Sequence, residues 1–190
     1  MSGRPSSARP VLDGAGPVGG LEIDIISEAG EWATVAEAIV RRAAEHAYVV
    51  AGFADEAELC IVLANDEFVQ TLNKTYRGKD KPTNVLSFPI GGIPAAVGGE
   101  PRIGMGPRLL GDIVLALETI TSEASEQKKS FEHHLTHLVV HGVLHLLGQD
   151  HEEDAEAEEM EAMERDILED LGIADPYAGE TGPEGRAADA

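Results

Sequence analysis

The spacing of hydrophobic residues predicts strands and helices between about residues 21 and 171. Four stretches rich in Ile, Val and Leu, alternating with polar residues or continuous, are typical of β-strands: residues 21–26, 58–64, 84–89 and 111–117. Five stretches with apolar residues every three or four positions are typical of helices: residues 31–48, 65–74, 118–128, 131–147 and 152–171. Because these elements mix without strict alternation, the pattern predicts an α+β fold, a small sheet of about four strands packed by about five helices.

The segments outside these elements predict one domain, residues 21–173, with a tail at each end. Residues 1–20 contain three prolines and two arginines but no apolar core, so we expect a disordered N-terminal tail and no secretory signal. Residues 174–190 are rich in Gly, Pro, Asp and Glu without periodicity, which predicts a disordered acidic C-terminal tail. The Gly/Pro-rich segment 90–107 is either a surface insertion or a mobile flap beside the functional site.

Composition favours a cytoplasmic protein. No apolar run approaches the ~18 residues that span a membrane, and Cys60, the only cysteine, lies in an apolar stretch that predicts a buried thiol. The net charge of −21 speaks against nucleic-acid binding. However, residues 151–190 carry 15 of the 35 acidic side chains, whereas residues 74–81 carry four of the 14 basic ones. Local potential governs a cleft, so a basic cleft remains compatible with this charge.

Residues 141–151, reading HGVLHLLGQDH, carry the strongest candidate chemistry. On a helix, His141 and His145 lie one above the other on the same face. Gly148 is placed to end this helix, and a short turn returns His151 towards the pair. Three imidazoles without a fourth protein ligand are typical of an open catalytic zinc site at the end of a buried helix.

Two alternatives remain open in this stretch. His137 and His141 are an equally good helical pair, although His145 is nearer the returning His151; we therefore expect His137 to be an outer or packing group. Asp150 either caps the last helix together with Glu153 or hydrogen-bonds a liganding histidine. Gly142 stands where zinc peptidases of the H-E-x-x-H kind place their general base, which argues against peptidase chemistry.

The motif H-G-x-L-H-L-x-G-x-D-H resembles the signature of the YbeY family, bacterial metal-dependent endoribonucleases that mature ribosomal RNA. Residues 76–89 (YRGKDKPTNVLSFP) resemble the family's second signature, and residues 110–113 (LGDI) extend the likeness. The resemblance implies a mixed sheet with one antiparallel edge strand. It also implies a single-strand-specific endoribonuclease that acts in 16S rRNA 3′-end maturation and ribosome quality control, with RNA and the ribosome or ribosomal proteins as partners and no DNA substrate.

The resemblance also suggests roles for individual residues. It places a functionally required arginine at Arg77, whose guanidinium can bind two phosphate oxygens and stays charged. From their chemistry alone, Lys79 and Lys81 either contact RNA or lie in a solvated loop, and the hydroxyl of Ser87 is a candidate for a contact with RNA. Asp112, in the LGDI stretch of the resemblance, is a candidate for an outer or structural carboxylate. His141, His145 and His151 are the expected ligands of one Zn²⁺, with Ni²⁺ or Cu²⁺ as possible substitutes.

We therefore predict metal-assisted hydrolysis of RNA phosphodiester bonds, with His141 and Arg77 as the central catalytic residues. The sequence leaves open whether water or the ribose 2′-hydroxyl attacks phosphorus. Two rival functions are a zinc-stabilised ribosome-assembly factor without catalysis and a zinc hydrolase of a small amide or ester.

Overall fold

A computed structural model of the chain describes residues 20–90, 106–149 and 154–174. The described residues leave out the predicted tails except for residues 20 and 174, most of the Gly/Pro-rich 90–107 segment, and the stretch with Asp150 and His151. The predictions made for those segments are therefore untested.

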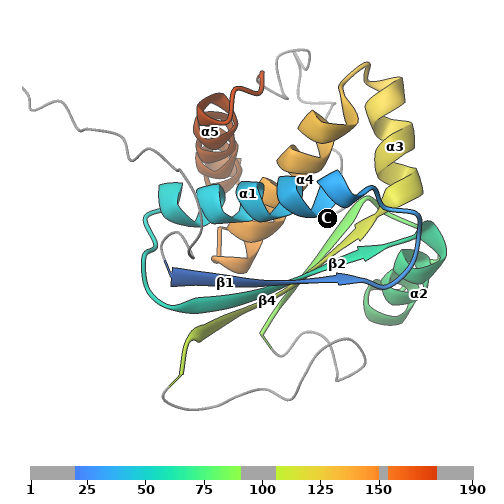
Figure 1. The fold of residues 1–190 in the computed structure, drawn as a ribbon, viewed down its shortest axis with the longest axis horizontal. Coiled ribbons are helices and arrows are strands. Elements are labelled where there is room, and N and C mark those ends of the chain that lie inside the picture. Colours follow the sequence, from blue (N-terminus) through green and yellow to red (C-terminus); the bar gives the residue numbers. More distant parts are fainter. Residues whose placement is uncertain (1–19, 91–105, 150–153, 175–190) are drawn as a thin grey trace, which may run out of the picture.

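The described residues form four strands and five helices, as the hydrophobic pattern predicts (Figure 1). The strands are β1 (Leu21–Ser27), β2 (Ala57–Ala64), β3 (Val85–Pro89) and β4 (Arg108–Ala116). The helices are α1 (Thr34–Val50), α2 (Asp66–Arg77), α3 (Leu117–Glu126), α4 (Phe131–Leu146) and α5 (Asp154–Asp170). The predicted α+β class is confirmed.

Two elements begin three residues away from their predicted starts. Helix α1 begins at Thr34 because the backbone of Ala33 is extended, with ψ of 144°. In the segment before it, the indole of Trp32 donates a hydrogen bond to the carbonyl of Ala64, 3.0 Å away. Strand β4 begins at Arg108, three residues before the predicted start, and its register against β2 shifts between Glu58 and Leu59. Such a shift inserts an extra residue, here Leu110, into β4.

The sheet has the strand order β1-β2-β4-β3. Strands β1, β2 and β4 are parallel, and β3 is an antiparallel edge strand, as the family resemblance implies. Gly111 is required where β4 passes β3: its φ is 132°, and a Cβ there would collide with the carbonyl oxygen of Phe88.

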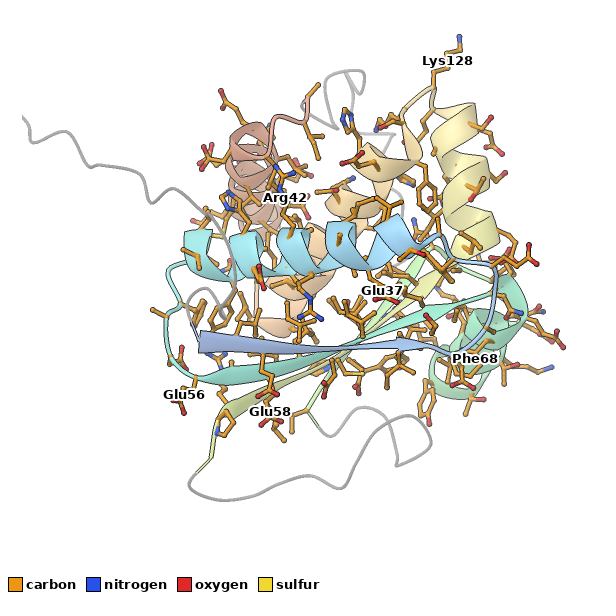
Figure 2. All side chains as sticks on the ribbon, in the orientation of Figure 1. Glu37, Arg42, Glu56, Glu58, Phe68 and Lys128 are labelled. Atoms are coloured by element: carbon orange, nitrogen blue, oxygen red, sulfur yellow. The ribbon has the colours of Figure 1, made fainter. Side chains whose placement is uncertain are left out.

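The two faces of the sheet are covered unequally (Figure 1). Helices α1, α3, α4 and α5 lie on one face and build the larger core, which includes Val40, Ile113 and Val143. Helix α2 alone packs on the other face, where Val69 and Leu72 contact Val114 and their neighbours. Figure 2 shows Phe68 of α2 and Glu58 of β2 on this second face, opposite α1. Within the described ranges, no helix is long and apolar enough to cross a membrane.

Candidate active site

Helix α4, which carries the histidines, is buried on most sides. Its sequence supplies apolar residues on nearly every face, and Leu135, Val139 and Val143 are fully inaccessible. The hydroxyl of Ser130 accepts a hydrogen bond from the amide of His133, 3.1 Å away, and caps the start. Gly148, with φ of 86°, follows the last turn, and its amide bonds the carbonyl of His145. The predicted stop at Gly148 is confirmed, and it leaves the last two histidines at the helix end.

His141 and His145 converge as their spacing predicts. Their Nε2 atoms lie 2.9 Å apart and their ring centroids 4.4 Å apart. Two nitrogen ligands at 2.0–2.1 Å from a tetrahedral zinc ion are separated by about 3.3 Å. The two imidazoles therefore aim at one point with nearly the spacing that a shared metal ion requires.

Glu164 of α5 is a site residue that the sequence analysis missed. Its Oε1 lies 2.7 Å from Nδ1 of His141, and its side chain is only 1% exposed. Burial by itself raises the pKa of Glu164, but hydrogen bonds from His137 and His141 outweigh burial and hold that pKa well below its usual range. The carboxylate is thus ionised beside the imidazole pair. The only sequence signal was a glutamate among the buried apolar positions of α5, between Met160 and Leu168.

The other histidines of α4 face different partners. His137 Nε2 lies 3.5 Å from the second oxygen of Glu164, so His137 contacts the carboxylate behind His141. His134 is buried and its Nε2 lies 2.7 Å from Glu123 of α3. His133 is exposed. Of the two helical pairs that the sequence leaves open, the 141/145 pair is the one whose ring nitrogens meet.

Gly142 brings the histidine pair against the sheet. A Cβ at this position would lie 3.0 Å from Cδ1 of Ile113 and 3.1 Å from Oγ of Ser87. The Ser87 hydroxyl is also 3.5 Å from the Gly142 carbonyl oxygen, at the limit of a hydrogen bond. A side chain here would press on Ile113 and Ser87, and these neighbours or the helix would have to move by a few tenths of an ångström. Packing therefore disfavours a glutamate after the first histidine, and the sequence has glycine there.

Arg77 ends helix α2, on the other face of the sheet from the histidines. Tyr76 packs edge-on against Phe88 of β3, whose neighbour Ser87 lies beside Gly142 on the opposite face. The end of α2 and helix α4 therefore contact adjacent residues of the same edge strand. Arg77 is half-buried, and burial lowers the pKa of its guanidinium. Among the described residues, none forms a hydrogen bond or ion pair with it.

The basic loop after Arg77 is held by the helix that precedes it. Gly78, with φ of 70°, turns the chain, and the buried Asn73 donates from Nδ2 to the carbonyl of Lys81, 2.8 Å away. Asp80 accepts from Gln70 and lies 2.6 Å from Nζ of Lys74, and these hydrogen bonds lower the pKa of Asp80. Lys79 and Lys81 are thus presented on a loop whose backbone is anchored at both ends.

Asp112 lies on the sheet face opposite the histidines. It follows Gly111 in β4 and shares the second sheet face with Cys60, which is half-buried rather than buried. Burial and then the neighbouring Asp112 raise the pKa of the Cys60 thiol to about 12, and burial raises the pKa of Asp112. Glu164, not Asp112, is the carboxylate that reaches the imidazole pair.

The described part of the chain contains two converging imidazoles but no set of three His, Cys, Asp or Glu side chains that could hold a metal ion. The expected third ligand, His151, and the alternative roles of Asp150 lie outside it.

Comparisons with known proteins agree with the motifs. The family model described as Endoribonuclease YbeY matches residues 23–172. An endoribonuclease YbeY from Parvibaculum lavamentivorans is 60% identical over 163 residues, covering 86% of this chain and 88% of that protein. One from Bradyrhizobium diazoefficiens is 49% identical over 162 residues, covering 85% and 86%. The solution structure of TM1509 from Thermotoga maritima matches with a TM-score of 0.50 and 25% identity, covering 87% of this chain and 100% of that one. The chain therefore belongs to the YbeY family of endoribonucleases.

Proposed function

We propose that this protein is a metal-dependent endoribonuclease that hydrolyses phosphodiester bonds of single-stranded RNA. Family membership supports the RNA-hydrolysing activity. The observation that carries the metal dependence is the convergence of His141 and His145, whose Nε2 atoms meet at 2.9 Å. Without a bridging cation, two such nitrogens share a single proton, whereas a metal ion takes both lone pairs.

The proposed ligands of one Zn²⁺ are His141, His145 and His151, with Ni²⁺ or Cu²⁺ as substitutes. The donor set suits the ion because neutral imidazoles are common zinc ligands and three of them leave a position open. When bound, such an ion supplies Lewis acidity and an activated water.

The chain's own residues supply binding and charge. The Arg77 guanidinium is half-buried without a protein partner in the described ranges, and it stays charged at neutral pH. It is thus available to bind phosphate oxygens and stabilise the charge that builds on them during hydrolysis. Lys79 and Lys81 attract the RNA backbone from the anchored loop, and Ser87 offers a hydroxyl beside Gly142. The edge strand β3 lies between the basic loop with Arg77 and the histidine pair. We propose that the RNA strand follows β3.

The proposed cellular role follows from the family: 16S rRNA 3′-end maturation and ribosome quality control, with the ribosome or ribosomal proteins as partners. Its test is the accumulation of unprocessed 16S rRNA 3′ ends in cells that lack the protein. Normal 3′ ends in such cells would contradict this role.

The test of the activity combines metal content with cleavage of a labelled single-stranded RNA, using a double-stranded RNA as the comparison substrate. We expect about one zinc per chain, loss of cleavage on chelation, and recovery on addition of zinc. Arg77→Glu should retain the zinc but cleave at least about 100-fold more slowly, as when a charge-stabilising donor is removed from an active site. Arg42→Glu, the same charge reversal at an exposed residue of α1 (Figure 2), should cleave as wild type. Wild-type protein that holds zinc and cuts no RNA would contradict the proposal.

A further inference from the structure

Glu164 occupies a position that packing alone would give to an apolar residue. Its neighbours on the buried side of α5, Met160, Ile167 and Leu168, all belong to the main core. A buried carboxylate loses hydration, and buried ion pairs are often replaceable by apolar side chains of similar volume without loss of stability. Stability therefore gives no sufficient reason for a carboxylate at this position.

The contacts of Glu164 point to a role at His141. Oε1 lies 2.7 Å from Nδ1 of His141, and Oε2 lies 3.5 Å from Nε2 of His137. An ionised carboxylate only accepts hydrogen bonds, so the proton of a neutral His141 must be on Nδ1. The lone pair of His141 is then on Nε2, the atom that faces Nε2 of His145.

We propose that Glu164 is a positioning residue that holds His141 in the Nδ1–H tautomer and directs its Nε2 at the metal ion. The inference rests on the proposed metal site. Nε2 of His137 lies 3.5 Å from the second oxygen, so a second imidazole packs against the carboxylate behind His141. Carboxylates that hold metal-binding imidazoles in this way orient the ring and raise its basicity.

Helix α4 contains a matched control. His134 also lies 2.7 Å from a carboxylate, that of Glu123. The His134 imidazole, however, is buried and is not among the proposed ligands. Glu164→Gln and Glu123→Gln therefore make the same chemical change beside two histidines of one helix. Only the first change should affect the metal.

The experiment measures Zn²⁺ affinity of the full chain by competition with a chromogenic chelator, and the His141 tautomer by ¹⁵N NMR of the imidazole. We expect Glu164→Gln to bind Zn²⁺ about 10- to 100-fold more weakly and the metal-free variant to lose its Nδ1–H preference at His141. Glu123→Gln should match wild type in both. Glu164→Met, which preserves the packing volume, replaces Glu164→Gln if circular dichroism shows that the latter does not fold.

The outcomes separate this inference from the metal proposal. If wild type binds Zn²⁺ and the folded Glu164 variant binds it equally well, the positioning role is overturned and the metal site stands. If both Glu variants weaken binding equally, the effect is general destabilisation, and the role is again overturned. If wild type does not bind Zn²⁺, Ni²⁺ or Cu²⁺, the metal site fails and the inference fails with it.

Discussion

The two ends of helix α4 carry the same chemical pair in opposite settings. At the first turn, the His134 side chain is 4% exposed and its carboxylate, Glu123, is 29% exposed. At the last turns the order reverses: His141 is 19% exposed and Glu164 only 1%. The hydrogen-bonding distance is 2.7 Å in both pairs. The pair distance therefore says little about function.

The second ring nitrogen makes the difference between the pairs. Nδ1 of His134 is buried without a hydrogen-bond partner. The only hydrogen bond of this imidazole's nitrogens among the described residues is therefore the one between Nε2 and Glu123, which connects α4 to α3. Asn84 donates to the same Glu123, which connects this end of α4 to the start of β3. Nε2 of His141 instead faces His145 near the surface. A histidine whose one ring nitrogen contacts a buried carboxylate, while the other faces a second imidazole, can serve a metal ion.

The largest expected contrast comes from removing each imidazole. His141→Ala should lose bound zinc and slow RNA cleavage by more than about 100-fold, since deleting a ligand exceeds the effect of deleting a residue behind it. His134→Ala should keep zinc and activity per folded molecule. Metal analysis and cleavage rates check both variants, with circular dichroism as the folding control. Equal losses in the two variants would remove the distinction between the ends of α4.

A second change, at Gly142, pushes helix α4 and its histidine pair away from the sheet but leaves both histidines unchanged. Gly142→Val should destabilise the protein by about 2 kcal/mol, because the added methyl groups overpack against Ile113 and Ser87. Urea unfolding measures this loss. The double variant Gly142→Val/Ile113→Val has a shorter side chain at residue 113 and should recover part of the lost stability. A Gly142→Val protein as stable as wild type would show that α4 can shift away from the sheet at no cost.

A third change tests the other end of the helix. Ser130→Ala removes the side-chain acceptor for the amide of His133 and should cost about 1 kcal/mol of unfolding free energy. Zinc affinity should not change, since the cap lies more than two turns from His141. A shifted zinc affinity in this variant would mean that the two ends of α4 are energetically coupled.

The smallest expected effect is a difference in pH dependence. Burial raises the pKa of Glu123, but hydrogen bonds from His134 and Asn84 outweigh it and leave this pKa below the ordinary 4.5. A lowered folded-state pKa adds stability above about pH 4.5, and this stability is lost as the pH falls through the folded value. Glu123→Gln should therefore lose less stability than wild type between pH 5 and pH 3. Parallel stability–pH curves from urea unfolding would contradict the paired state of Glu123.

The sequence by itself determined the local elements and the histidine pair. Helices and strands follow from the period of the apolar residues, and the caps at Asn65 and Gly148 follow from side chains and backbone conformations within one turn. His141 and His145 converge because residues four apart on a helix lie on one face. These features depend on neighbours along the chain, so they could be predicted without the fold.

Only the tertiary structure decided which distant groups surround that pair. Glu164 lies 23 residues from His141 and reaches it because α5 packs against α4. Asp112 lies on the sheet face that α4 does not cover. Strand β4 is apolar on both faces, so its sequence does not say which face α4 covers. The position of Arg77 was also decided by the fold, because the end of α2 reaches the edge strand β3 from the sheet face opposite α4. Periodicity specifies which side of an element is buried, but the partner that buries it is selected by long-range packing.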